Sequence, residues 1–161
     1  MAHHTIPELA LDDAKVAATL LQERLVSLLD LQLTLKHIHW NVVGPNFIAV
    51  HEMLDEHVES IRAMTDEIAE RIAILGFEPV GTPAYITKNR AWDDYPINRG
   101  GVGEHLKALD SVYDGIIGDH RKVMASVAEA DSVTEDLMIG QLAKLELYQW
   151  FVRSHIANTA S

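Results

Sequence analysis

The apolar residues of this chain recur at intervals of three and four, and this periodicity constrains its fold more than any other feature because it is typical of amphipathic α-helices. The first periodic segment ends at Gly44-Pro45, a pair that stops a helix. A second segment starts near Asn46 and ends at Gly76. The apolar positions of the two segments are Val16, Leu20, Leu21, Leu25, Leu28, Leu31, Leu35 and Ile38, and then Val50, Leu54, Val58, Ile61, Ile68, Ile72 and Leu75.

The second half of the chain predicts two more long helices after an irregular connection. Prolines and glycines interrupt the pattern between residues 77 and 103, where we expect a long loop with one short helix over residues 84–90. The next helix covers residues 104–128. The last one begins at a capping box, Ser132-Val-Thr-Glu135, and ends near residue 155.

Four long helices with one long crossover connection predict an all-α fold: a ferritin-like four-helix bundle with a short helix in the loop between the second and third long helices. The sequence contains no repeat and no domain boundary. We therefore expect a single domain over residues 1–161, with a short flexible N-terminal tail at residues 1–10. Gly115 and Gly118 in the third long helix favour a close helix crossing, because glycine otherwise weakens a helix.

The composition excludes several classes of protein. The chain has no cysteine, so it forms no disulfide and no thiolate metal site. The N-terminus lacks the features of a signal peptide and no apolar run is long enough for a bilayer, so we expect a cytoplasmic protein. The formal charge of −11 repels the phosphates of nucleic acids and attracts cations.

The histidines and carboxylates depart from the usual di-metal pattern, in which Glu-x-x-His motifs supply ligands inside one bundle. No glutamate of this chain has a histidine three residues later. The second helix instead carries His51, Asp55, Asp66 and Glu70 within an arc of about 100° on one face. Asp55 and Asp66 are about 16 Å apart along the axis, too far to share an ion held at about 2 Å from each ligand.

A two-fold axis would bring His51 and Asp55 of one copy next to Asp66 and Glu70 of a second copy. In an antiparallel pair of identical helices, residues whose numbers add to the same total stand opposite each other. By this rule His51 faces Glu70 of the second copy, and Asp55 faces its Asp66. The spacing therefore predicts an isologous dimer with two equivalent metal sites, each built from both copies.

Further residues support this interpretation. The same register predicts ion pairs between Glu59 and Arg62 of the two copies. His39 adds a second imidazole, because the turn through Gly44-Pro45 brings the end of the first helix back alongside His51. Two histidines and three carboxylates suit Fe(II), and also Zn, Mn or Co. Any one of these residues alone would usually be solvated or structural, but five in a symmetric register favour a metal site.

These residues resemble the Dps family of mini-ferritins, the DNA-binding proteins from starved cells. The stretch HWNVVGPNFIAVHEMLD fits the family pattern His-Trp-x-aliphatic-x-Gly followed by Val-His-x-x-x-Asp. The stretch DEIAERIAILGFEP fits the pattern Asp-x-x-Ala-Glu-Arg-x-x-x-Leu-Gly. WDDYPI and YQWFVRSH extend the resemblance over nearly the whole chain.

The resemblance implies a ferroxidase that assembles as a hollow homododecamer, oxidises Fe(II) to Fe(III) with hydrogen peroxide in preference to dioxygen, and stores ferric mineral. Peroxide would take one electron from each of two ferrous ions, so that no hydroxyl radical is released. Trp40 beside the site would either pack or donate an electron to stray oxidant. The implied metal ligands, across the dimer two-fold, are His39, His51, Asp55, Asp66 and Glu70.

The resemblance also suggests a route for iron. The family admits iron through acidic pores at a three-fold axis, and Asp110 and Asp119 look like the matching positions, although solvated helix carboxylates fit them nearly as well. Glu52 and Glu56 are candidates for seeding mineral on the cavity wall.

The chain departs from the family in its termini. Family members that bind DNA use flexible tails rich in Lys and Arg, which release counterions from phosphates. Here the first fourteen residues contain no Lys or Arg, and the only basic residue after Arg153 is His155. We therefore expect weak or absent DNA binding. Two alternatives stay open: an architectural DNA-binding protein whose basic patches form on assembly, and a metal-dependent hydrolase that uses the same site to activate water.

Overall fold

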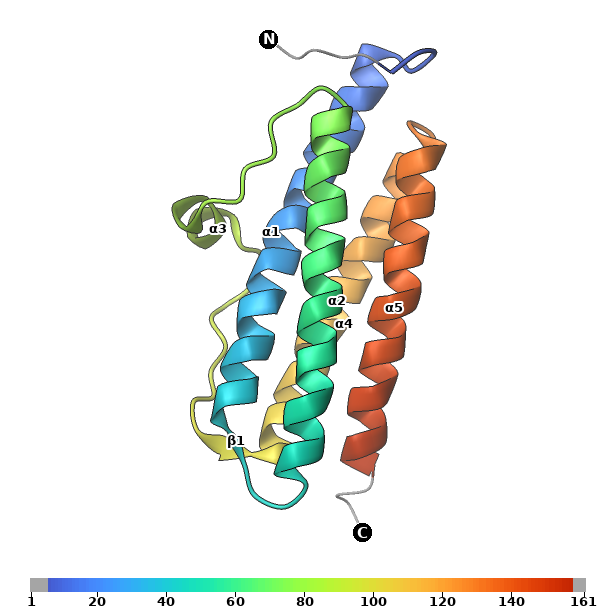
Figure 1. The fold of residues 1–161 in the computed structure, drawn as a ribbon. Helices are drawn as coiled ribbons and strands as arrows, with labels where there is room; N and C mark the ends of the chain where they lie inside the picture. The colour runs from blue at the N-terminus through green and yellow to red at the C-terminus, as the bar shows by residue number, and fades with distance from the viewer. Residues whose placement is uncertain (1–5, 158–161) are drawn as a thin grey trace.

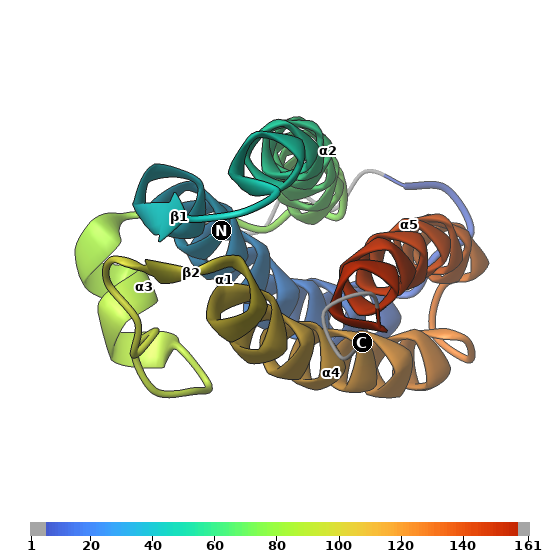
Figure 2. The same ribbon diagram turned by 90° about the horizontal axis from the view of Figure 1, so that it is seen from below.

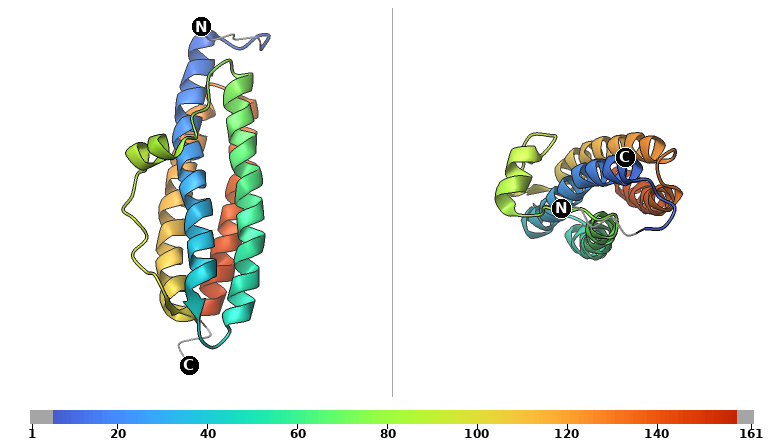
Figure 3. Two further views of the ribbon diagram at one scale, coloured as in Figure 1. Left: turned by 60° about the vertical axis from the view of Figure 1, so that its left-hand side comes forward. Right: turned by 90° about the horizontal axis from the view of Figure 1, so that it is seen from above.

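The computed structural model describes residues 6–157 of the chain. Four long helices run side by side, and a short helix lies outside the bundle beside the first (Figures 1 and 3). This arrangement confirms the predicted four-helix bundle with a short helix in its long loop. The elements are α1 (Leu11–Asn41), β1 (Val42–Val43), α2 (Phe47–Ile74), α3 (Pro83–Asn89), β2 (Gly100–Gly101), α4 (Val102–Val127) and α5 (Ser132–Ala157).

Aliphatic side chains hold the four long helices together. Their order around the bundle is α2, α1, α4 and α5 (Figure 2), with α1 packed most extensively on α2 and α4 on α5. Leu28 and Leu35 of α1, Ile61 and Ile68 of α2, and Leu109 of α4 are fully buried. Burying such a side chain stabilises the fold by about 1.5–3 kcal/mol. Among the described residues, no helix is long and apolar enough to pass through a membrane.

A tight turn sets the start of α2 against the end of α1. Gly44 has a φ of 102° and Asn46 a φ of 63°, in the left-handed region that glycine and asparagine tolerate best. The N–H of Phe47 donates to the Gly44 carbonyl at 3.1 Å and closes the turn. The first turns of α2 therefore lie beside the last turn of α1, at the lower end of the bundle in Figure 1.

A two-residue parallel bridge, which the sequence did not predict, joins this turn to the end of the long loop. β1 pairs with β2, and Val42 stands opposite Gly100. A Cβ atom at Gly100 would lie 2.8 Å from Oε2 of Glu104 and 2.9 Å from Cγ2 of Ile97, so a larger residue would have to displace these two side chains. The bridge fixes the start of α4 relative to the end of α1.

Buried polar contacts hold the long loop between α2 and α4 against α1. Asp30, only 7% exposed, accepts hydrogen bonds from Nε1 of Trp92 at 2.6 Å and from Nη2 of Arg90 at 3.1 Å. The Gln22 amide exchanges two hydrogen bonds with the Val80 backbone, at 2.9 and 2.8 Å. The course of the loop is therefore fixed although most of it has no regular structure.

The cap of α5 differs from the prediction. The helix begins at Ser132, but the carboxylate of Asp131 accepts the N–H groups of Val133 and Thr134, both at 3.3 Å. The predicted capping box at Ser132 is therefore wrong. The reason is that a carboxylate one residue earlier reaches the orphan donors and also pairs with Arg71 of α2.

Two further expectations differ in detail. A Cβ atom at Gly115 or Gly118 would meet nothing within 4 Å, so the expected close crossing is wrong for the described part of a single chain. α1 begins at Leu11, and Ile6 and Leu9 before it pack against the core. Residues 1–5 of the expected tail lie outside the described residues.

Candidate metal centre

Two histidines face each other across the turn between α1 and α2. The rings of His39 and His51 are stacked, with centroids 3.6 Å apart and planes 21° from parallel. The Nδ1 atom of each ring lies 3.0 Å from the backbone carbonyl of the other residue. Because a carbonyl only accepts, each Nδ1 carries the hydrogen in these bonds, and the lone pair of each Nε2 stays available to a metal ion.

Asp55 completes a set of three candidate ligands. It lies one turn after His51 on α2, and ligand atoms of His39, His51 and Asp55 all lie within 4.8 Å of one another. Two ligand atoms that each lie about 2 Å from the same ion are at most about 4 Å apart. Small side-chain movements would therefore bring the three ligand atoms close enough to bind one ion. Two imidazoles and one carboxylate form the donor set of many non-haem Fe(II) sites.

The carboxylate of Asp55 is already paired with a cation. Nζ of Lys36 lies 2.6 Å from its Oδ1, and Nδ1 of His39 lies 3.4 Å from the same atom. The hydrogen bond from Lys36 is the largest cause that lowers the pKa of Asp55, so this carboxyl is ionised at neutral pH. The sequence interpretation missed Lys36, although its position one turn before His39 on the same helix face could have indicated it.

The structure does not bring Asp66 and Glu70 to this cluster. Both side chains are exposed on α2, further along the helix, and no group of candidate ligands in the described residues includes them. Arg62 and Glu59, expected to pair between copies, form an ion pair at 3.1 Å within the chain, with side chains 58% and 72% exposed. One chain therefore assembles three of the five predicted ligands and leaves two on a solvent-facing surface.

Trp40, the residue predicted to act beside the metal, is 72% exposed. It follows His39 at the end of α1, and most of its side chain is open to solvent in this single chain.

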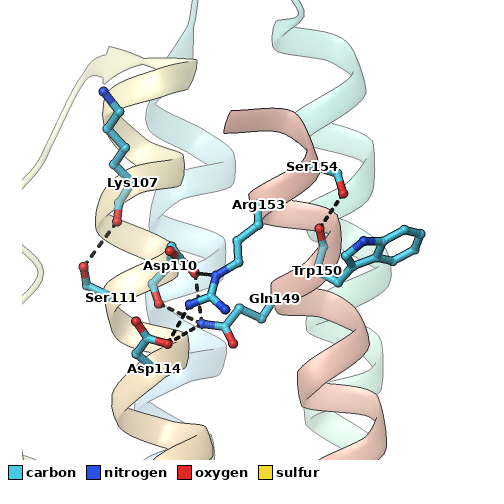
Figure 4. Close-up of polar contacts among 8 residues, drawn as sticks. All are labelled: Lys107, Asp110, Ser111, Asp114, Gln149, Trp150, Arg153 and Ser154. Carbon is cyan, nitrogen blue, oxygen red and sulfur yellow. Dashed lines mark hydrogen bonds and ion pairs between the residues drawn. The ribbon is translucent and has the colours of Figure 1, made fainter. Parts of the chain in front are cut away.

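The two predicted pore residues are engaged in contacts within the chain. Asp110 accepts hydrogen bonds from Nε of Arg153 at 2.8 Å and from the Gln149 amide at 2.9 Å, and Asp114 one turn later also binds both side chains (Figure 4). This network joins α4 to α5, and the sequence interpretation did not include three of its members: Asp114, Gln149 and Arg153.

Asp119 is similarly engaged, since it lies 2.8 Å from Nζ of Lys122 and 4.0 Å from the buried guanidinium of Arg24. An incoming cation would therefore compete with Arg and Lys at Asp110 and at Asp119.

Comparison with known proteins agrees with this architecture. A ferritin-like domain model matches residues 18–161, and the chain belongs to the ferritin-like family. It is 53% identical over 156 residues to the DNA protection during starvation protein of Mycolicibacterium smegmatis, which covers 97% of this chain and 85% of the relative. It is 45% identical over 157 residues to the fine tangled pili major subunit of Haemophilus ducreyi, with coverage of 98% and 83%.

The structural comparison agrees. A tetragonal form of Mycobacterium smegmatis Dps matches with a TM-score of 0.94 and 54% identity, covering 96% of this chain and 94% of that one. Within the ferritin-like family, the chain is a member of the Dps proteins.

Proposed function

We propose that the protein is a ferroxidase, active in the cytoplasm, that oxidises Fe(II), preferably with hydrogen peroxide, and stores the ferric product in a hollow dodecamer. The observation that carries the proposal is the cluster of His39, His51 and Asp55, in which both Nε2 atoms are free and the carboxylate is ionised. Iron is the substrate here rather than a resident cofactor.

The site would be completed by a second copy of the chain. Asp66 and Glu70 are exposed on the same helix as His51 and Asp55, and their spacing matches an antiparallel pairing of two α2 helices. Three carboxylates would then neutralise the growing positive charge as Fe(II) becomes Fe(III). The two imidazoles, held by reciprocal bonds to backbone carbonyls, would keep their orientation through the reaction.

The electron balance favours two ferrous ions at one site. Hydrogen peroxide needs two electrons and two protons to become two water molecules, and each ferrous ion supplies one electron. A site that holds both ions consumes the two oxidising equivalents together. Lys36 would leave Asp55 when the first ion binds, because one carboxylate oxygen cannot lie 2.6 Å from an ammonium and also coordinate a dication without strong charge repulsion.

Stopped-flow measurement of ferric absorbance after mixing with Fe(II) and peroxide tests this function. We expect rapid oxidation by the wild type and loss of the fast phase in His51→Ala and in Asp66→Ala. Asp93→Ala removes an exposed loop carboxylate and is the matched control. Fast oxidation by both site variants would contradict the proposal.

An architectural role on DNA is the second candidate, because relatives carry the name DNA protection during starvation protein. The formal charge of −11 opposes it, since binding to DNA depends on releasing counterions from phosphates. A gel-shift titration at physiological salt is expected to show little or no retardation of duplex DNA. Salt-sensitive retardation without added divalent cations would favour the architectural role.

Asp110 and Asp119 stay candidates for an iron entry route, although cations already occupy their carboxylates. A hydrolase that uses the same cluster would need a substrate pocket beside it, and five of the cavities in the described residues are lined by residues other than His39, His51 and Asp55.

A further inference from the structure

A histidine and a glutamate face the same small space where α4 begins. β2 leads directly into α4, and its buried Gly100 stands opposite Val42 of β1 (Figure 2). The point where a Cβ atom of Gly100 would lie is 2.8 Å from Oε2 of Glu104 and 3.4 Å from Nε2 of His105. Because glycine has no side chain, both of these ligand-type atoms approach this point.

The hydrogen bonds of Tyr95 fix the position of the hydrogen on the His105 ring. Oη of Tyr95 lies 3.0 Å from Nδ1 of His105 and 3.2 Å from the backbone carbonyl of the same residue. A carbonyl only accepts, so the phenol O–H donates to it, and the Nδ1–H of the ring then donates to Oη. In this arrangement both contacts are hydrogen bonds. It leaves the lone pair on Nε2, the atom with which histidine commonly binds metal ions.

The lone pair of His105 is available to a ligand. Within residues 6–157, its Nε2 atom is buried and has no hydrogen-bond partner. Burial is the largest cause that lowers the pKa of His105, so the ring is neutral at pH 7. Burying a polar atom without a partner costs free energy, and a cation bound to the lone pair would offset that cost.

The groups around the His105 ring are electron-rich. The negative charge of Glu104 and the backbone carbonyls of Asn98 and Asn41 oppose the effect of burial on the pKa of His105, so all three lie near the ring. The ion pairs formed by residues 6–157 do not include Glu104. An imidazole nitrogen with carboxylate and carbonyl oxygens suits divalent transition metals, whereas an anion would be repelled.

Glu104 also connects this buried space to the solvent. His105 is 0% exposed, whereas Glu104 is exposed. An ion bound between them would lie about 2 Å from each ligand atom. Rotation of the flexible glutamate side chain brings its carboxylate to that distance. An ion therefore reaches the histidine from the surface without separation of the long helices.

We propose that His105 and Glu104 form a second metal site, which binds one divalent transition-metal ion through Nε2 and the carboxylate. Tyr95 accepts the Nδ1–H and orients the ring, as the outer hydrogen-bond partner of a metal-binding histidine does. Water and the nearby backbone carbonyls supply the other ligands.

This second site lies at the same end of the bundle as the cluster of His39, His51 and Asp55 but shares no ligand with it. β1 follows α1 directly and pairs with β2, which places the start of α4 beside the end of α1. The cluster uses α1 and α2, and the second site uses α4. The inference therefore does not depend on the proposed ferroxidase reaction.

Crystals of the full-length protein soaked in Co(II) test the proposal directly. We expect an anomalous difference peak about 2 Å from Nε2 of His105 and from a carboxylate oxygen of Glu104. Absence of a peak at His105 would overturn the proposal, whether or not the cluster of His39 and His51 is filled. A peak at His105 with an unfilled cluster would support the second site and count against the proposed ferroxidase centre.

Calorimetric titration with Co(II) tests the same site in solution. His51→Ala provides the background, because it removes an imidazole of the first cluster, and we expect this chain to retain one bound ion. Adding Glu104→Gln removes a charged ligand, and adding Gly100→Ala places a Cβ atom in the shared space, so each should abolish that binding. Glu129→Gln, at an exposed glutamate beyond the other end of α4, is the matched control. Equal binding with Glu104→Gln and with the control would contradict the proposal.

Tyr95→Phe tests the assigned position of the ring hydrogen. The variant removes the acceptor of the Nδ1–H, and loss of such an outer partner weakens metal affinity by about 10–100-fold. A purely structural role of Tyr95 would lower the melting temperature of the metal-free protein and leave the affinity for Co(II) unchanged. An unchanged affinity would therefore contradict the tautomer on which the second site rests.

Discussion

The polar groups in the interior of the bundle have more hydrogen-bond partners within the chain than those at the proposed metal centre. Asp30 is 7% exposed, and donors from Trp92 and Arg90 saturate its carboxylate. Asp55 is exposed and lies 2.6 Å from Lys36 and 3.4 Å from His39, while the neighbouring histidines keep an unused lone pair. Carboxylates that hold the chain together are satisfied within it, and those proposed to bind iron retain free acceptor capacity.

The same comparison classifies the two proposed pore residues, whose exposure is intermediate. Asp110 and Asp119 are partly buried and bound by arginine or lysine, which resembles the structural group more than the metal-binding group. Asp66 and Glu70 are exposed like Asp55. The comparison therefore separates the five proposed ligands from the two proposed pore residues.

Removing the interior carboxylate should cost the most stability. Asp30→Ala removes the acceptor of the Trp92 N–H and one of the two carboxylate partners of Arg90, which keeps Asp94, and hydrogen bonds to a charged group contribute about 1.5–3 kcal/mol each. Denaturant unfolding measures the loss, with Asp93→Ala in the same loop as the exposed control. A loss no greater than that of the control would show that Asp30 is not a structural anchor.

A buried histidine should make the fold sensitive to acid. Burial is the largest cause that lowers the pKa of His120 from 6.5 to about 4. The unfolded chain therefore binds more protons than the folded one between these values, and stability falls as the pH drops from 6.5 toward 4. The loss attributable to this residue reaches roughly 3 kcal/mol.

The matched variant for this prediction is His120→Gln, because its amide can still donate to Oε1 of Gln141, which His120 contacts at 3.2 Å. Urea unfolding at pH 7 and at pH 5 should show a smaller acid-induced loss in the variant than in the wild type. Equal losses in both proteins would contradict the assignment.

The observed helix cap predicts a smaller effect. Asp131→Ala removes the acceptor for two N–H groups of α5 and the partner of Arg71, and should cost about 1–2 kcal/mol. Ser132→Ala, at the position that the sequence pattern favoured, should change the free energy of unfolding by less than about 0.5 kcal/mol. A larger loss of stability in Ser132→Ala than in Asp131→Ala, measured by thermal unfolding, would support the capping box at Ser132 instead.

Substitution at the metal centre should have the smallest effect on stability and a large effect on iron. Asp55→Asn removes the charge that Lys36 and the histidines share, yet this carboxylate is exposed and its ion pair is screened by solvent. We expect an unchanged melting temperature together with weaker binding of Fe(II) in a calorimetric titration. A melting temperature of Asp55→Asn below that of the wild type would show that Asp55 has a structural role instead.

Local patterns in the sequence predicted the parts of the molecule that depend on local spacing. The helices, the Gly44-Pro45 turn and the approach of His39 to His51 all follow from periodicity and turn chemistry. The bridge between β1 and β2 and the anchor at Asp30 were missed, because each joins residues about sixty positions apart and neither leaves a local signature.

At the candidate metal site, the spacing in the sequence indicated which residue types come together but not the hydrogen bonds that they form with each other. The reciprocal contacts of His39 and His51 with each other's backbone carbonyls depend on the course of the turn, which no side-chain pattern reports. The cap at Asp131 was misjudged because two adjacent residues both fit a cap, and the contact with Arg71 on another helix decided between them.

We propose that each metal centre is shared by two copies of the chain, and complementation between two inactive chains distinguishes such a shared centre from one built within a single chain. In a mixed pair of His51→Ala and Asp66→Ala chains, shared sites would leave one centre with both residues intact and the other with neither. Random co-assembly of equal amounts should then restore about one quarter of wild-type ferroxidase activity, because half of the pairs are mixed. Activity no higher than that of the two separate variants would show that the centre lies within one chain.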